Sequence, residues 1–351
     1  MQPLVQAAKT NALVSNVVVF ALAPPIKHYF SQFFDPRLFS SVSCQWLDVF
    51  TIDPRQWKDA LTELKPSVLV TGWGTPLLPD SYVDSKDLAL RYVCHLAGGV
   101  KSQLPRRLIE RGVLVSNWGE SISHTIAEHA VLLVLGLLRN LPEWSGYITH
   151  WQDREQDFPL MNLSTRSLRG KRVGLHGFGA IAREITRMLR PFRVELTAYS
   201  KGVPKSLFEE YDVKPASSLE ELFATSDIII ECEALTALTR GTVNERLLRL
   251  LPENAVFVNV GRGAVVEEAA LIKIGLEGRL RIGLDVYEQE PVSSQYPLLR
   301  KKNVLLSPHI AGPTEDGLTI MCEFALKNLQ RYFQGDKLDG LVSLEIYDRS
   351  T

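Results

Sequence analysis

The segment VGLHGFGAIARE, residues 173–184, decides the predicted fold. In it Gly177, Gly179 and Ala182 have the spacing G-x-G-x-x-A, after an apolar run typical of a buried strand and at the start of a helical pattern. The first glycine permits a tight turn, the second lets the backbone approach a pyrophosphate at the helix N-terminus, and the alanine still allows close helix packing. We therefore predict a dinucleotide-binding turn. A glycine-rich turn without a ligand is the alternative, which this context disfavours.

Short apolar runs on both sides of this turn alternate with segments of helical length. The runs lack the polar alternation of half-exposed strands, so we expect them to be buried on both faces of parallel sheets. Strands separated by helices in this way predict an α/β fold. The runs assigned to strands are NVVVFAL (16–22), SVLVTGW (67–73), LRYVCHL (90–96), VELTAYS (194–200), SDIIIE (226–231), AVFVNVGRG (255–263), RIGLDVY (281–287) and NVLLSPH (303–309).

The composition limits what such a fold binds. The chain has 351 residues, 45% of them hydrophobic, and a formal net charge of −1, which gives no basic field for nucleic acid or an anionic membrane. Its four cysteines form no C-x-x-C pair, so the sequence indicates no metal site and favours a reducing compartment, which we take to be the cytoplasm. The apolar stretch 12–23 is too short to cross a bilayer and is predicted to be a buried strand, with a signal segment as the alternative. A small molecule is the expected partner.

Three other segments have a readable character. Residues 123–140 have the apolar content of a long buried helix, on which His129 is expected to pack. The polar, aromatic-rich residues 141–159 are interpreted as an irregular excursion or lid. Residues 315–335 form an amphipathic helix pattern that ends at a glycine, and we expect this helix to return to the first domain.

The strand after the glycine turn ends in VELTAYSKG, residues 194–202, without the acidic residue that holds the adenosine ribose in this fingerprint. Ser200 and Lys201 are found there instead. A hydroxyl and an ammonium could hold a 2′-phosphate, so we expect NADPH to be favoured over NADH. The alternative is that both are ordinary turn residues and that either cofactor binds.

Three later strand ends carry an arginine, carboxylates and a histidine. Arg262 stands between two glycines, Asp285, Glu288 and Glu290 follow the next strand, and His309 follows the last. Because ligands bind beyond the carboxyl ends of parallel strands, we expect these side chains to line a site. Hydride transfer to a carbonyl builds negative charge on oxygen, which needs a cation and a proton donor, and an imidazole beside a carboxylate suits the second task. A surface-turn arginine and a structural histidine are the alternatives.

The order of the motifs HGFGAIA, VNVGRGAVVEEAAL, GLDVYEQEP and SPHIAG resembles the D-isomer-specific 2-hydroxyacid dehydrogenases, the family of phosphoglycerate dehydrogenase, glyoxylate and hydroxypyruvate reductases and D-lactate dehydrogenase. The resemblance implies two Rossmann-like α/β domains with a cleft between them. One is a discontinuous, flavodoxin-like substrate domain (1–118 and 311–351), and the other is a doubly wound dinucleotide-binding domain (119–310). It also implies an NAD or NADP cofactor and a homodimer that forms through the helix at 123–140.

The resemblance also implies roles for single residues. Arg262 is implied to bind and polarise the 2-oxo acid, His309 to be the proton donor, and Glu290, rather than Glu288, to be its partner. Asp285 is implied to touch the nicotinamide carboxamide. The whole predicted cofactor-binding set is Gly177, Phe178, Gly179, Ala180, Ile181, Ser200, Lys201, Val260, Gly261, Arg262, Asp285 and His309.

The predicted substrate-binding residues are Trp73, Gly98, Gly99 and Arg262. The two glycines lie in LAGGVKSQL, residues 96–104, in the loop where backbone N–H groups of the family meet the substrate carboxylate. Lys101 stands there at a position that is usually acidic, and it either covers the surface or faces the substrate. Trp73 either shapes the substrate or packs within its own domain.

We therefore predict hydride transfer between a nicotinamide and a 2-oxo acid or D-2-hydroxy acid. The alternative is a corepressor-like interaction protein that senses a dinucleotide without turnover. The complete set of catalytic residue types and the lack of a charged tail count against this alternative. The sequence leaves the particular acid open, because one methylene in such a pocket changes selectivity by only about 1–3 kcal/mol.

Overall fold

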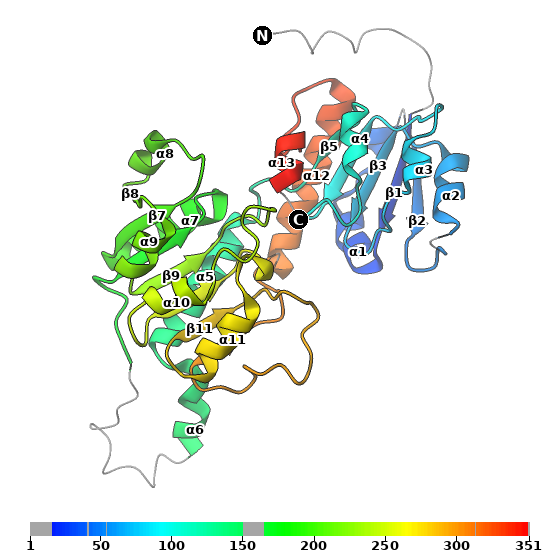
Figure 1. The fold of residues 1–351 in the computed structure, drawn as a ribbon. Helices are drawn as coiled ribbons and strands as arrows, with labels where there is room; N and C mark the ends of the chain where they lie inside the picture. Colours follow the sequence, from blue (N-terminus) through cyan, green and yellow to red (C-terminus); the bar gives the residue numbers. More distant parts are fainter. Residues whose placement is uncertain (1–15, 41, 54, 150–164, 313, 350–351) are drawn as a thin grey trace. The chain divides into compact units, whose positions relative to one another are not determined.

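The computed structural model describes residues 16–40, 42–53, 55–149, 165–312 and 314–349. The chain divides into two compact units (Figure 1). Unit 1 comprises Met1–Ile122 and Glu315–Thr351, and unit 2 comprises Ser123–Thr314. Both ends of the chain therefore belong to unit 1.

Unit 1 is built on a sheet of five parallel strands in the order β2-β1-β3-β4-β5. This is the flavodoxin-like order, as the resemblance implied. The strands are β1 (Val17–Leu22), β2 (Ser43–Asp48), β3 (Val68–Gly72), β4 (Tyr92–Leu96) and β5 (Leu114–Ser116).

Helices cover both faces of this sheet. On one face α1 and α12 bury aromatic and aliphatic side chains such as Phe20, Phe30 and Met321. On the other face α2, α3, α4 and the terminal α13 pack around Trp57 and Leu69. The predicted return of the C-terminal helix to the first domain is confirmed. The bounds are α1 (Pro24–Phe33), α2 (Trp57–Leu64), α3 (Asp80–Val83), α4 (Arg106–Glu110), α12 (Glu315–Gln334) and α13 (Leu344–Arg349).

Unit 2 contains a parallel sheet of seven strands in the order β12-β11-β10-β9-β6-β7-β8. Counted from β6, the first six strands have the order 3-2-1-4-5-6 of a doubly wound dinucleotide fold, so the predicted fold class is confirmed. The strand order reverses between β6 and β9. The strands are β6 (Arg172–His176), β7 (Glu195–Tyr199), β8 (Lys214–Pro215), β9 (Ile228–Glu231), β10 (Val256–Asn259), β11 (Arg281–Leu284) and β12 (Val304–Leu306).

The helices of unit 2 also lie on both faces of its sheet (Figure 1). One face is covered by α5, α7 and α8, whose apolar residues include Leu133, Ile185 and Phe208. The other is covered by α9, α10 and α11, which pack on Phe257 and Ile282. The bounds are α5 (Ser123–Leu138), α7 (Ala180–Leu189), α8 (Lys205–Glu210), α9 (Leu219–Thr225), α10 (Glu245–Leu250) and α11 (Glu268–Leu276).

Three strands were not predicted from the sequence, and each has a physical reason. The edge strand β2 is half-exposed and therefore lacks a continuous apolar run. The strands β5 and β8 have three and two residues, and β8 contains a proline, which only an edge strand tolerates. Long, fully buried strands give the clearest sequence signal.

The segment predicted as an irregular excursion begins with helical structure. A 3-10 turn (Leu141–Glu143) and α6 (Trp144–Thr149) follow α5, so the prediction was wrong for these residues; residues 150–159 lie outside the described part of the chain.

Among the described residues no single helix has the length and apolarity to cross a bilayer, although α5 and the helical residues Leu141–Thr149, bent by 61°, meet that test together. Leu132 on α5 and Ile148 on α6 expose large apolar side chains. The homodimer expected to form through α5 stays a prediction.

Candidate active site

The glycine turn after β6 has the geometry that a pyrophosphate needs. Gly177 has φ +89°, and a Cβ there would lie 2.8 Å from the backbone of Glu233, so only glycine fits. Gly179 precedes the first residue of α7, and a Cβ built on it would meet no atom within 4 Å. Open space therefore adjoins the N-terminus of a ten-residue helix, whose free N–H groups favour an anion.

The neighbouring residues of the turn contribute to this cradle in different ways. Ala180, Ile181 and Ala182 are the first three residues of α7. Ala182 is fully buried, as close packing of the helix on the sheet requires. The side chain of Phe178 is buried and stacks on Phe208 with ring centroids 4.7 Å apart. Phe178 can therefore contact a cofactor only through its backbone.

Close backbone packing explains the glycines around Arg262. A Cβ on Gly263 would lie 1.9 Å from the carbonyl carbon of Tyr287, and a Cβ on Gly261 would lie 3.2 Å from the backbone of Cys232. The loop after β10 is thus pressed between the loops after β9 and β11. Val260, at the start of this loop, is buried, so its side chain packs inside the unit.

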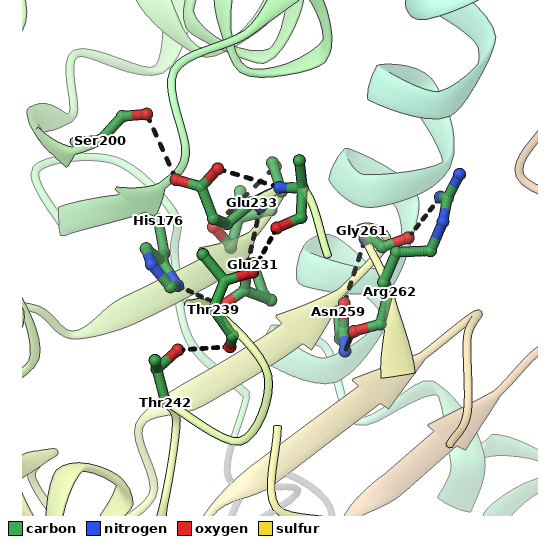
Figure 2. A network of polar contacts seen from close by, with 12 residues as sticks. His176, Ser200, Glu231, Glu233, Thr239, Thr242, Asn259, Gly261 and Arg262 are labelled. Atoms are coloured by element: carbon green, nitrogen blue, oxygen red, sulfur yellow. Dashed lines mark hydrogen bonds and ion pairs between the residues drawn. The ribbon is translucent and has the colours of Figure 1, made fainter. Parts of the chain in front are cut away.

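Asn259, the last residue of β10, holds the loop from inside. Its Nδ2 donates to the carbonyl of Arg262 at 3.1 Å, and its Oδ1 accepts from the N–H of Gly261 at 3.0 Å (Figure 2). The guanidinium of Arg262 donates to the Gly261 carbonyl at 2.7 Å. Asn259 was not singled out in the sequence, where it is one polar residue in an apolar run.

The charge of Arg262 lies close to Glu290. Burial lowers the pKa of Arg262, and the negative charge of Glu290 opposes that shift. Since an arginine stays protonated in proteins, the loop presents a half-buried cation beside a carboxylate.

His309 and Glu290 form a hydrogen-bonded pair at the ends of β12 and β11. The distance from His309 Nδ1 to Glu290 Oε2 is 2.6 Å, and Glu290 Oε1 accepts from the N–H of Tyr287 at 3.0 Å. The His309 side chain is 49% exposed and its backbone has φ +53°. Because Glu290 occupies Nδ1, Nε2 is the nitrogen that can meet a substrate. The structure thus pairs the histidine with the glutamate that the resemblance implied, and not with Glu288.

Asp285 is buried and holds the loop that carries His309. Its carboxylate accepts from Ser307 Oγ at 2.6 Å and from the backbone N–H groups of Ile310 and Ala311 at 2.9 and 3.0 Å. These three contacts flank His309 on both sides. A contact of Asp285 with the nicotinamide, implied by the resemblance, stays a prediction.

His129 supports the same loop from α5. Its Nε2 lies 2.8 Å from Ser307 Oγ and 3.5 Å from Asp285 Oδ1. The sequence predicted ordinary packing on an apolar helix, so this polar role of His129 was missed. A lone histidine in an apolar helix gives no signal of a partner 178 residues away.

At the end of β7 the structure corrects a premise of the cofactor prediction. The hydroxyl of Ser200 donates to Glu233 Oε2 at 3.2 Å, whereas Lys201 is exposed. The sequence predicted no carboxylate at this position, because the end of β7 itself carries none. Glu233 reaches it from the end of β9 (Figure 2).

A second histidine and glutamate lie beneath the glycine turn. The distance from His176 Nδ1 to Glu231 Oε2 is 2.5 Å, and both side chains are buried. Burial opposes the charge of His176, but the charge and hydrogen bond of Glu231, with the charge of Glu233, raise its pKa above the ordinary value. Of the two roles considered for His176, contact with a cofactor or a part in the turn, its burial favours the second.

The predicted substrate loop of unit 1 is rigidly supported. A Cβ on Gly98 would lie 2.6 Å from the indole nitrogen of Trp118, and the Gly98 carbonyl accepts from Asn117 Nδ2 at 2.7 Å. The ring of Trp118 meets that of Trp73 edge to face, with centroids 5.2 Å apart. Trp73 is 39% exposed, so it both packs within its unit and offers an aromatic surface next to this loop.

Gly99, the next residue of this loop, is held by His95 in its neutral form. His95 is buried, and burial lowers its pKa to about 4, although a hydrogen bond to Gly99 acts against the shift. A carbonyl only accepts, so His95 Nε2 donates to Gly99 O at 2.9 Å and Nδ1 accepts from Thr71 Oγ1 at 2.8 Å. Lys101 donates to the Asp348 carbonyl on α13, which matches its surface-covering alternative.

The strand order, the glycine turn and the residues at the strand ends define a dinucleotide-dependent oxidoreductase. The sequence model of one protein family, described as "D-isomer specific 2-hydroxyacid dehydrogenase, NAD binding domain", matches residues 131–311. The glyoxylate reductase of Aeropyrum pernix is 32% identical over 265 residues, 73% of this chain and 77% of that protein. A glyoxylate/hydroxypyruvate reductase of Arabidopsis thaliana is 32% identical over 238 residues, 67% and 71% of the two chains. The protein belongs to the D-isomer specific 2-hydroxyacid dehydrogenase family, and the resemblance found in the motifs is confirmed.

Solved structures agree with this fold. A glyoxylate reductase from Paecilomyes thermophila superposes with a TM-score of 0.77 at 24% identity and covers 94% of this chain and 99% of its own. An NADPH-dependent glyoxylate/hydroxypyruvate reductase from Sinorhizobium meliloti, in complex with NADP and malonate, gives a TM-score of 0.71 at 24% identity and covers 96% and 99%. The protein is therefore an NAD- or NADP-dependent oxidoreductase of 2-hydroxy acids.

Proposed function

We propose that the protein reduces a 2-oxo acid to the D-2-hydroxy acid, with His309 as proton donor, Glu290 as its partner and Arg262 as the cation at the reacting oxygen. The observation that carries this proposal is the hydrogen bond from His309 to Glu290, beside the guanidinium of Arg262. These side chains come from three adjacent strand ends of one sheet. A structural role alone does not require an arginine, a carboxylate and an imidazole on adjacent loops.

The residues of the glycine turn fit the dinucleotide. The open space at Gly179 and the N-terminus of α7 would receive the pyrophosphate, and Gly177 keeps the turn tight enough for that approach. When bound, the reduced nicotinamide supplies the hydride. Asp285 fixes the loop of His309, so that the proton donor keeps its place.

The protein residues then handle the charge that develops on the substrate. As hydride adds to the carbonyl carbon, its oxygen gains negative charge, which the half-buried guanidinium of Arg262 stabilises. His309 donates the proton at Nε2 to that oxygen, and the product is a hydroxyl group. Glu290 orients the imidazole through Nδ1.

Unit 1 is proposed to recognise the substrate. His95 and Asn117 donate hydrogen bonds to the carbonyls of Gly99 and Gly98 and so hold those carbonyls within unit 1. The backbone N–H groups around the two glycines would then bind the substrate carboxylate. Trp73 and Trp118 would contact its substituent. The names of the relatives make glyoxylate and hydroxypyruvate the first acids to test, and the aromatic pair makes larger 2-oxo acids the second group.

The experiment is the loss of reduced-nicotinamide absorbance by the purified protein with glyoxylate, hydroxypyruvate, pyruvate and bulkier 2-oxo acids. We expect turnover of at least one acid, with a product of D configuration. Tight dinucleotide binding with no turnover across this panel would contradict the proposal and favour the corepressor-like alternative.

A further inference from the structure

A carboxylate and a hydroxyl meet across the end of β6, where the strand order reverses. Ser200 lies directly beyond β7 and Glu233 lies two residues beyond β9, and these strands flank β6 on its two sides. The Ser200 hydroxyl donates to Glu233 Oε2 at 3.2 Å, and both side chains are half-buried (Figure 2). The pair therefore lies beside the glycine turn, where a dinucleotide fold receives the adenosine half of its cofactor.

The position of Glu233 is fixed by its surroundings. Its N–H donates to Glu231 Oε1 at 2.7 Å, and its own Oε1 accepts from the N–H of Ala234 at 2.9 Å. Its backbone packs directly on Gly177. The hydroxyl of Thr239 donates to the Ala234 carbonyl at 2.6 Å and closes the turn that follows. The carboxylate is thus held at this place by the fold.

Glu233 adds a second carboxylate to this network, and its contacts among the described residues are hydrogen bonds from Ser200 and from the N–H of Ala234. His176 lies 2.5 Å from Glu231, and although burial opposes its charge, the charge of Glu231 raises the pKa of His176. Lys201 is exposed, whereas Ser200 and Glu233 are half-buried. A group that enters beside Ser200 therefore meets a half-buried carboxylate first.

We infer that Glu233 makes this enzyme prefer NADH to NADPH. The inference rests on the proposed function, because it assumes that the glycine turn holds the pyrophosphate. From there the adenosine ribose would reach the end of β7, where the Glu233 carboxylate would accept hydrogen bonds from its hydroxyls and repel a 2′-phosphate. Glu233 thus does from the end of β9 what an acidic residue at the end of β7 does in the common fingerprint. This reverses the preference predicted from Ser200 and Lys201.

The test compares the dissociation constants of NADH and NADPH for the purified wild-type protein and for Glu233→Gln. Glutamine keeps the size and one acceptor oxygen but removes the charge. We expect the wild type to bind NADH at least about tenfold more tightly, and Glu233→Gln to shrink that ratio by about tenfold, mainly through tighter NADPH binding. The matched control is Glu210→Gln, which removes an exposed carboxylate from α8 and should leave the ratio unchanged.

Three outcomes would overturn the inference. They are equal affinities in the wild type, tighter binding of NADPH, and a ratio that Glu233→Gln does not change. A merely structural role of Glu233 would weaken both cofactors together and so leave the ratio constant. If the wild type bound neither dinucleotide, the proposed function would fail as well, whereas binding with an unchanged ratio would reject the role of Glu233 alone.

Discussion

Unit 2 contains the same pair of side chains twice, in opposite surroundings. His176 and Glu231 are joined at 2.5 Å, and His309 and Glu290 at 2.6 Å, in both cases from Nδ1 to Oε2. The first pair is 3% and 0% exposed, and the second is 49% and 34% exposed. The hydrogen bond is alike, so burial is what separates the two pairs.

The comparison shows how position along a strand decides the use of a residue. His176 and Glu231 are the last residues of β6 and β9 and stay within the sheet, where their charges must cancel. Glu290 and His309 lie beyond the ends of β11 and β12, on loops that reach solvent. Only the second pair can exchange a proton with a substrate, whereas the first fixes the turn on which the cofactor is proposed to rest.

The largest expected effect is a difference in stability between two variants, His176→Asn and His309→Asn. His176→Asn removes the charge that compensates buried Glu231, and we expect it to lower the free energy of unfolding of unit 2 by about 3 kcal/mol. His309→Asn should change it by less than about 1 kcal/mol, because that pair is exposed and asparagine tolerates the positive φ of this position. Denaturant unfolding of both variants measures the difference.

A double variant provides the control for this prediction. If an unpaired charge causes the loss, His176→Leu combined with Glu231→Leu should be more stable than His176→Leu alone, since no buried charge remains. Equal losses for the two His→Asn variants would contradict the distinction between the pairs.

A smaller effect is expected from pH, with opposite signs in the two units. The pKa of His176 is raised above 6.5, so its charge stabilises unit 2 fully at low pH, and this contribution is lost as the pH rises through the folded value. The pKa of His95 is lowered to about 4, so neutral His95 stabilises unit 1 above pH 6.5, and this is lost as the pH falls toward 4.

Hydrogen exchange resolved along the chain can follow each unit separately. Strands β6 and β9 should open more readily as the pH rises, after correction for the intrinsic exchange rate, and β3 and β4 as it falls. His176→Asn should abolish the first trend. If the opening equilibrium of β6 did not change as the pH rose through the pKa of His176, burial and not the pair of His176 and Glu231 would set the stability of this strand.

Much of this molecule could be predicted from local sequence patterns. Buried strands appear as continuous apolar runs, and Gly177 stands at a position where a positive φ and a close backbone approach admit only glycine. The pairing of His309 with Glu290 was implied by the resemblance of the motifs to a known family, and the two strands that carry these residues are adjacent. These features are local, or they join strand ends whose adjacency the fold class dictates.

Contacts that cross the sheet could not be predicted in this way. Glu233 meets Ser200 over the end of a strand that lies between theirs, and His129 reaches Ser307 from a helix on one face. Neither pair has a characteristic spacing, because the sheet order and side-chain directions create the contact. The predicted cofactor preference therefore rested on Ser200 and Lys201 alone, without the carboxylate of Glu233 that contacts Ser200.

The most direct test of the central claim is the turnover of a 2-oxo acid by wild-type protein and by His309→Asn under the same conditions. We predict that the variant loses about a hundredfold or more in kcat, while its cofactor affinity and its unfolding free energy stay close to those of the wild type. Unchanged turnover would show that the exposed pair of His309 and Glu290 does not deliver the proton, and the account of this site would be wrong.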